Sequence, residues 1–186
     1  MNELSLYILD LAQNSLAAGA KNVRITVTFR PDCDRIEIEI EDDGCGMDEA
    51  LLARVSSPFV TTRETRSVGL GIPMAQQLCE MCEGAFALES RAGTGTRLTM
   101  SLRASHIDRP PMGGLADTLY ALIAASCETT DFFFRCACGA RTFEFSTAEI
   151  RGTLGSDVPL NTPEALRWIR DCLREGIEET APLNHQ

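Results

Sequence analysis

The stretch that most constrains the fold is IEIEIEDDGCGM, residues 36–47, in which an alternating segment leads directly into two acids and two glycines. Strict alternation of isoleucine and glutamate predicts a strand over 36–42 with one buried face and one charged face. Gly44 and Gly46 follow at alternate positions, where glycine permits a tight turn and a close approach of the backbone to a ligand. The pattern favours a sheet with a binding turn at the end of one strand.

The first helix, predicted over 3–18, carries unusually short polar side chains. Its polar face holds Asp10 and Asn14, which are four residues apart and therefore stacked. Surface helices usually carry long solvated side chains there, whereas a short acid and a short amide stay close to the helix backbone. The opposite, apolar face holds Leu4, Ile8, Leu11, Ala12 and Leu16.

The remaining sequence alternates between strand and helix patterns. Periodicity predicts further strands over 23–29, 84–90, 96–102, 131–137 and 141–146, and helices over 48–55, 72–83, 115–126, 147–154 and 163–179. The Ser/Thr/Arg-rich stretch 56–69 has no period and is predicted to be a mobile loop, and the Pro/Gly-rich stretch 104–114 is predicted to be a linker. The residue composition of the chain changes near that linker.

Composition limits the partners that the chain can have. The net charge of −10 disfavours nucleic acid and membrane surfaces, because both are anionic. No apolar run is long enough to span a bilayer, no signal peptide opens the chain, and eight scattered cysteines in a chain of this size indicate reducing conditions. We therefore expect a cytoplasmic protein.

Two further glycine clusters indicate an anion site. GLG (69–71) leads into the helix predicted from residue 72, where backbone N–H groups and the helix dipole favour phosphate, and GTGT (93–96) lies in a predicted hairpin. A Walker A loop is excluded because the single lysine, Lys21, precedes Asn22. A dinucleotide fingerprint is also excluded, because Glu49 stands where the third glycine belongs.

Taken in order, ILDLAQNSLAAGA, DDGCGMD, SPFVTTR, VGLGIPMAQQL and GTGT resemble the N, G1, F, G2 and G3 boxes of the GHKL superfamily. The resemblance covers roughly residues 1–104. It implies an α+β fold, a two-layer α/β sandwich of the Bergerat type with a mixed sheet backed by three helices. We expect the ATP-binding domain over 1–104, a linker over 105–114, and a small α+β C-terminal domain of unknown role over 115–186.

The resemblance also implies the site residues. Asp10 stands where relatives carry a catalytic glutamate and is expected to act as the general base, although it is one methylene shorter. Asn14 is expected to hold Mg²⁺, Asp42 to accept a hydrogen bond from the adenine amino group, and Thr96 to complete the adenine contact. The other expected nucleotide contacts are Gly44, Gly46, Thr61, Thr62, Arg63, Gly69, Leu70 and Gly71.

The expected cofactors are ATP and Mg²⁺. No histidine box precedes the first helix, so the expected function is slow ATP hydrolysis or phosphorylation of a partner protein, in signal transduction, with the phosphoacceptor on that partner. Two alternatives stay open: a non-catalytic, ATP-dependent interaction switch, and a redox or metal sensor that uses Cys136 and Cys138, with or without Cys79 and Cys82. The sequence also leaves open a homodimer.

Overall fold

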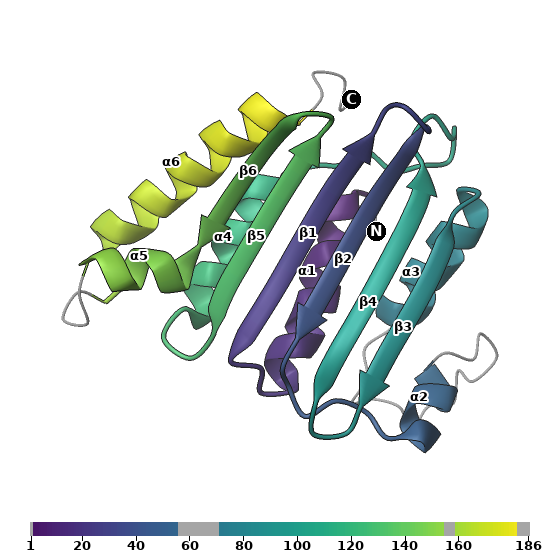
Figure 1. Cartoon of the computed structure of the whole chain (residues 1–186), viewed down its shortest axis with the longest axis horizontal. Helices are drawn as coiled ribbons and strands as arrows, with labels where there is room; N and C mark the ends of the chain where they lie inside the picture. The colour runs from purple at the N-terminus through teal and green to yellow at the C-terminus, as the bar shows by residue number, and fades with distance from the viewer. Residues whose placement is uncertain (1, 56–70, 155–158, 182–186) are drawn as a thin grey trace.

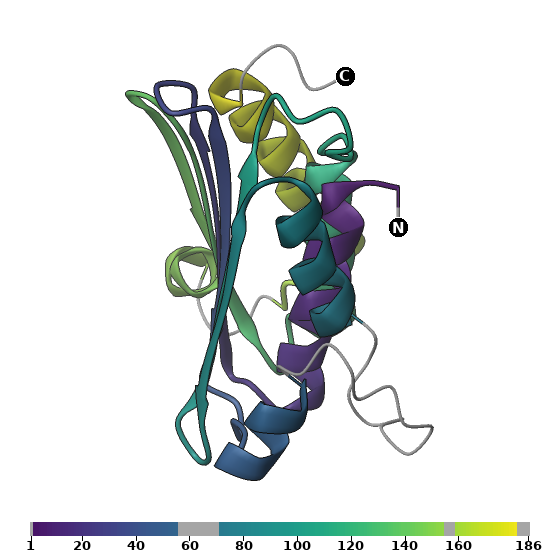
Figure 2. The same ribbon diagram turned by 90° about the vertical axis from the view of Figure 1, so that its right-hand side faces the viewer.

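A six-stranded sheet forms one layer of the molecule, and most of the helices form the other (Figures 1 and 2). The computed structural model describes residues 2–55, 71–154 and 159–181. The strands are β1 (Asn22–Arg30), β2 (Arg35–Asp42), β3 (Ala85–Arg91), β4 (Gly95–Arg103), β5 (Asp131–Cys138) and β6 (Arg141–Ser146). The helices are α1 (Leu4–Ala17), α2 (Glu49–Val55), α3 (Gly71–Met81), α4 (Leu115–Ser126), α5 (Thr147–Leu154) and α6 (Pro163–Thr180).

The strands run in the order β3-β4-β2-β1-β5-β6. Every neighbouring pair is antiparallel except β1 and β5, which are parallel, so the sheet is mixed as predicted. Ile25 of β1 pairs with Ile40 of β2 on one side and with Phe134 of β5 on the other. This register places the apolar side chains of successive strands in one continuous row.

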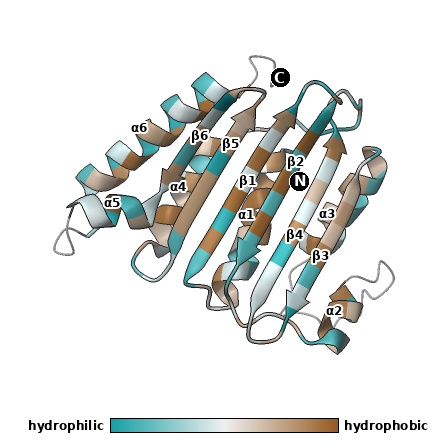
Figure 3. Cartoon of the chain, in the orientation of Figure 1, coloured by the Kyte–Doolittle hydropathy of each residue, from teal (hydrophilic) through white to brown (hydrophobic). Residues whose placement is uncertain are grey.

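The hydrophobic core lies between this row and the helices. Figure 2 shows α1, α3, α4 and α6 on one side of the sheet, and Figure 3 shows apolar and polar residues alternating along β1 and β2. On the inner face Ile25, Ile38 and Met100 are fully buried. The outer face carries charged pairs such as Arg97–Glu39, with 2.7 Å between Nη2 and Oε2. The predicted two-layer α+β sandwich is confirmed.

The segment after residue 104 extends the same sheet. Residues 105–114 contain no helix or strand and lie along the start of α1, where Leu4 N–H donates to the Pro111 carbonyl and Ser5 N–H to the Met112 carbonyl, both at 2.9 Å. β5 then pairs with β1, and α4 packs against α1. The described parts of 1–104 and 115–186 thus share one sheet and one core. The division of the chain into two domains stays a prediction.

The loop predicted over 56–69 lies outside the described residues, and with it Thr61, Thr62, Arg63 and Gly69. Leu70 lies outside them as well. Among the helices that the structure describes, none has the length and hydropathy required to cross a membrane.

Candidate nucleotide-binding site

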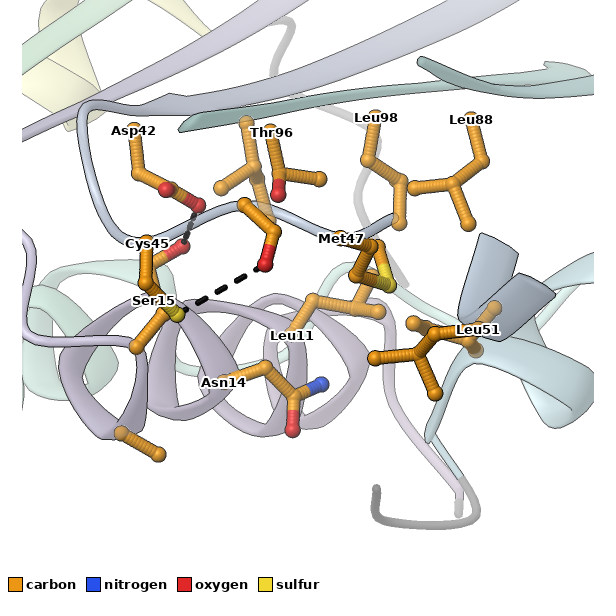
Figure 4. A pocket seen from close by; sticks show the side chains of 15 residues that line it. Leu11, Asn14, Ser15, Asp42, Cys45, Met47, Leu51, Leu88, Thr96 and Leu98 are labelled. Carbon is orange, nitrogen blue, oxygen red and sulfur yellow. Dashed lines mark hydrogen bonds between the residues drawn. The ribbon is translucent and has the colours of Figure 1, made fainter. Parts of the chain in front are cut away.

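A cavity of about 230 Å³ opens between α1 and the ends of the central strands (Figure 4). Asp42 at the end of β2, Thr96 in β4, and Asn14 and Ser15 in α1 supply its polar groups. The walls are largely apolar and come from Leu11, Ile40, Met47, Leu51, Ile72, Leu88 and Leu98. Such a cavity, apolar with a few converging polar atoms, suits a flat heteroaromatic ring with polar edges.

The carboxylate of Asp42 is held in one orientation from two sides. Ser15 Oγ donates to Oδ2 at 2.6 Å (Figure 4). The Gly44 N–H donates to Oδ1 at 2.9 Å. Because a carboxylate oxygen has two lone pairs, each oxygen keeps acceptor capacity for a ligand. Asp42 is therefore an oriented acceptor at the polar end of the cavity, as its predicted role requires.

The glycines around Asp42 let two turns pack against each other. Gly46 has a φ of +63°, and a Cβ there would lie 2.1 Å from the Arg91 carbonyl oxygen. Gly95 has a φ of +118°, and its Cβ would lie 1.9 Å from the Asp42 carbonyl oxygen. Side chains are excluded at both positions by conformation and by space. The structure thus brings the DDGCGM turn and the GTGT hairpin together, although they are about fifty residues apart.

Asp43, next in the chain, fixes the same turn to the start of β1. Its carboxylate accepts the Lys21 N–H at 2.7 Å, the Asn22 N–H at 2.8 Å and Asn22 Nδ2 at 2.7 Å. These hydrogen bonds, the side-chain bond from Asn22 first among them, lower the pKa of Asp43 below its ordinary value. Asp43 is thus a structural acid beside the acid that faces the cavity.

Thr96 is oriented by a residue that the sequence did not single out, Ser90 of β3. Ser90 Oγ donates to the Gly95 carbonyl at 2.9 Å, accepts the Met47 N–H at 2.9 Å, and lies 2.9 Å from Thr96 Oγ1. Since the one hydroxyl hydrogen of Ser90 is used on Gly95, Thr96 donates to Ser90 and keeps its own lone pairs as acceptors. Thr96 therefore faces the cavity as an acceptor.

Asn14 and Asp10 lie one turn apart on α1, toward the start of α3. Asn14 Nδ2 is buried and has no hydrogen-bond partner among the residues that the structure describes. Asp10 lies directly over Gly71, because a Cβ on Gly71 would be 1.9 Å from Asp10 Oδ2. The Asn14 amide N–H can therefore donate to a phosphate oxygen. The Asn14 side-chain oxygen and the Asp10 carboxylate are the kinds of ligand that Mg²⁺ prefers. The residues present fit a magnesium-bound phosphate at this end.

Ser15 and Ser90 are the functional candidates that sequence reasoning missed. Ser15 adjoins Asn14 in the first motif, and it falls on the apolar face of the helix with Ile8 and Leu11, where a polar side chain stands out. Ser90, the last residue but one of β3, pairs with Thr96, which follows from the hairpin pairing of β3 and β4. The position of each serine could be read from the local pattern. Their hydrogen-bond partners Asp42 and Met47 could not, because these residues lie far away in the sequence.

The cysteines form no comparable centre. Across residues 2–55, 71–154 and 159–181, no group of three or more His, Cys, Asp or Glu side chains is arranged to hold a metal ion. Burial raises the pKa of the Cys79 and Cys136 thiols to about 12, so both stay protonated and unreactive at neutral pH. Cys82 and Cys138 are also buried. The geometry gives the redox or metal alternative no support.

Sequence comparison now adds to this geometry. Residues 2–106 match the family described as histidine kinase-, DNA gyrase B- and HSP90-like ATPase. The match covers more than half of the chain, and the chain belongs to this family. It therefore contains an ATP-binding, kinase-like domain, as the sequence motifs predicted.

Its relatives include kinases and sensor proteins. Sporulation kinase E of Bacillus subtilis is 32% identical over 111 residues, which are 58% of this chain and 15% of that protein. Sensor protein DegM of a Bacillus species is 28% identical over 101 residues, 54% of this chain and 27% of its own. The osmosensing histidine protein kinase SLN1 of Saccharomyces cerevisiae is 40% identical over 72 residues, which are 36% of this chain and 6% of that protein. This chain spans about a quarter or less of each.

Proposed function

We propose that the chain binds Mg·ATP in the cavity beside Asp42 and uses it to hydrolyse ATP slowly or to phosphorylate a partner protein. The observation that carries the proposal is the Asp42 carboxylate, held by Ser15 and Gly44 at one end of an apolar cavity. An oriented acceptor beside apolar walls complements the amino edge and the faces of adenine. GTP presents a carbonyl oxygen at that edge, so the same acceptor disfavours it.

The phosphates would extend from the adenine end toward Asn14 and the start of α3. The N-terminus of α3 supplies N–H groups and a positive dipole end for anionic oxygen. Asn14 would hold Mg²⁺, which neutralises phosphate charge when bound. Asp10, one turn away, would accept a proton from water or from a partner hydroxyl. The predicted contacts of Thr61, Thr62, Arg63, Gly69 and Leu70 remain part of this proposal.

A non-catalytic switch is the second candidate, because Asp is shorter than the glutamate of related proteins. In that case nucleotide binding alone would change how the chain meets its partner. The two candidates share the binding site and differ only in the role of Asp10. Retained binding together with unchanged biological output in Asp10→Asn would favour the switch.

The first test is a calorimetric titration with a non-hydrolysable ATP analogue, with and without Mg²⁺. We expect micromolar to sub-millimolar binding that Asp42→Asn weakens at least about tenfold, because the amide presents a donor to the adenine amino group. Asn14→Ala should remove the Mg²⁺ dependence. Asp32→Asn, in the exposed β1–β2 turn, is the matched control and should bind as the parent does.

A GTP analogue gives the selectivity control. The proposal predicts a clear preference for ATP in the parent chain and a loss of that preference in Asp42→Asn. Absence of binding, or binding that is indifferent to Asp42, would refute the nucleotide site.

A further inference from the structure

A second and larger cavity lies at the opposite edge of the sheet from β3. It has a volume of about 640 Å³ and lies between the end of β6, α5 and the first half of α6. We call it the α5–α6 groove. Its apolar lining comes from Phe145, Ile150, Leu160, Trp168, Ile169 and Cys172.

Trp168 makes this groove more than a packing gap. It is the only tryptophan of the chain, and 54% of its surface is exposed. The neighbouring Ile169 is fully buried, as is Leu173 one turn further on. α6 therefore packs one face inward and presents its largest apolar side chain to the groove. Tryptophan in such a place is enriched at protein–protein contacts.

The charged side chains that line the groove are all negative. Glu144, Glu149 and Glu164 are the charged side chains that line the groove, and all are acidic. Glu144 lies 3.5 Å from Arg135, while Glu149 and Glu164 have no ion-pair partner within the described ranges. Glu149 and Glu164 belong to the first turns of α5 and α6. An anionic ligand would therefore meet repulsion.

The α5–α6 groove is separate from the nucleotide cavity. The nucleotide cavity is lined by α1, α2, α3, β2, β3, β4 and the turn after β2, whereas the groove is lined by β6, α5, α6 and the segment before α6. No residue lines both cavities among those that the structure describes. Occupancy of the groove therefore goes beyond the proposed nucleotide function and does not rest on it.

We propose that the α5–α6 groove docks a segment of a partner protein in which large apolar side chains alternate with lysine or arginine. The apolar side chains would cover Trp168, and the cations would pair with Glu149 and Glu164. Charge complementarity argues for this occupant over a second copy, because the chain carries a net charge of −10. A membrane surface is anionic and is disfavoured for the same reason.

Trp168 fluorescence tests the proposal directly, since no other tryptophan contributes. The probe is the synthetic peptide Lys-Leu-Lys-Phe-Lys-Leu-Lys, and its counterpart has glutamate in place of each lysine. We expect a saturable blue shift with the basic peptide, weakened by added salt, and no shift with the acidic one. The shift should be the same with and without an ATP analogue, which separates this outcome from the fate of the nucleotide site.

Charge reversal locates the binding. Glu164→Lys and Glu149→Lys, on different helices, should each lower the affinity for the basic peptide about five- to tenfold. The reason is that an attractive contact between glutamate and a peptide lysine becomes repulsive. Glu178→Lys changes the net charge equally on an exposed part of α6 outside the groove and should change affinity by less than about twofold. Equal weakening by all three variants, or no saturable shift in the parent chain, would overturn the proposal. A blue shift that grows with protein concentration alone would also overturn it, since a second copy would then cover Trp168.

Discussion

Ser15→Ala is the substitution that tests how the nucleotide site is oriented. The Ser15 side chain is buried on α1, and its hydroxyl donates to Asp42 Oδ2 at 2.6 Å. Alanine removes the donor and leaves the helix intact. The Gly44 N–H then remains as the described partner of the Asp42 carboxylate, which is held less firmly against rotation about the Cβ–Cγ bond.

The expected magnitude follows from these contacts. A hydrogen bond to a charged group contributes about 1.5–3 kcal/mol, and the lower end applies because Asp42 is half-buried and water can replace part of it. The higher helix propensity of alanine offsets about 0.5 kcal/mol of this loss in the free energy of unfolding. The net loss in the free energy of unfolding is therefore about 1 kcal/mol, or about 2–4 °C in Tm for a chain of this size. Nucleotide affinity should fall about tenfold, because the acceptor is no longer held.

Ser5→Ala provides the matched control on the same helix. Ser5 is also buried, but its hydroxyl donates to Glu3 Oε2 over a long 3.4 Å, far from the cavity. The helix-propensity gain is identical, so denaturant unfolding and calorimetric titration of the two variants isolate the Ser15–Asp42 bond. Ser5→Ala should bind nucleotide within about twofold of the parent. If Ser15→Ala also binds within twofold, the orientation of Asp42 does not depend on Ser15 and the reasoning fails.

Three further predictions concern the same end of the molecule. Gly71→Ala places a Cβ where Asp10 Oδ2 lies, so the carboxylate must move; ATP hydrolysis, measured as phosphate release, should fall at least about tenfold while the chain stays folded. Cys45 is exposed and lines the cavity, so Mg·ATP analogue should slow its alkylation, followed by peptide mass spectrometry, and should leave the exposed Cys33 of the β1–β2 turn unaffected. The pKa of Asp43 is lowered in the folded state, so its contribution to the free energy of unfolding is present above pH about 4 and is lost as the pH falls through the folded pKa. The free energy of unfolding of Asp43→Ala should therefore differ most from that of the parent near neutral pH and least in acid. Urea unfolding at several pH values measures this difference.

Each of these predictions has a contradicting outcome. Parent-like hydrolysis in Gly71→Ala, combined with loss of hydrolysis in Asp10→Asn, would show that the contact with Gly71 does not position the acid. Equal protection of Cys45 and Cys33 by nucleotide would indicate a global effect rather than occupancy of the cavity. A stability difference for Asp43→Ala that grows toward acid pH would reverse the sign worked out above.

The local structure could be predicted from the sequence, because period and turn residues are local properties. The observed β2 and α4 begin and end within one residue of the predicted ranges. The caps follow the same logic, as Asp48 Oδ1 accepts the Leu51 N–H at 2.8 Å and Thr162 Oγ1 accepts the Ala165 N–H at 3.3 Å. Along β5, Phe132, Phe134, Cys136 and Cys138 are buried at alternate positions, as the two-residue period of a strand requires.

What the sequence could not supply were contacts between distant segments. The Pro/Gly-rich stretch 105–114 suggested separation, yet it returns the chain to α1 and allows β5 to join β1. Composition predicts that a segment is a loop, but it does not predict which element the chain after that loop packs against. The partnership of Ser15 with Asp42, and the position of Asp10 over Gly71, likewise depend on how α1 lies on the sheet.

The pairing of β1 with β5 has a consequence for how the chain is made. Asn22 pairs with Asp131, so the partner of β1 on that side is synthesised 131 − 22 = 109 residues later. At about 5–20 residues per second, the ribosome takes roughly 5–20 s to deliver it. During that interval the N-terminal half can already build the Asp42 turn against α1, while the other edge of β1 still offers free N–H and C=O groups. The nascent chain thus carries an unpaired strand beside a nearly finished nucleotide site, and chaperones that bind extended segments have their opportunity there.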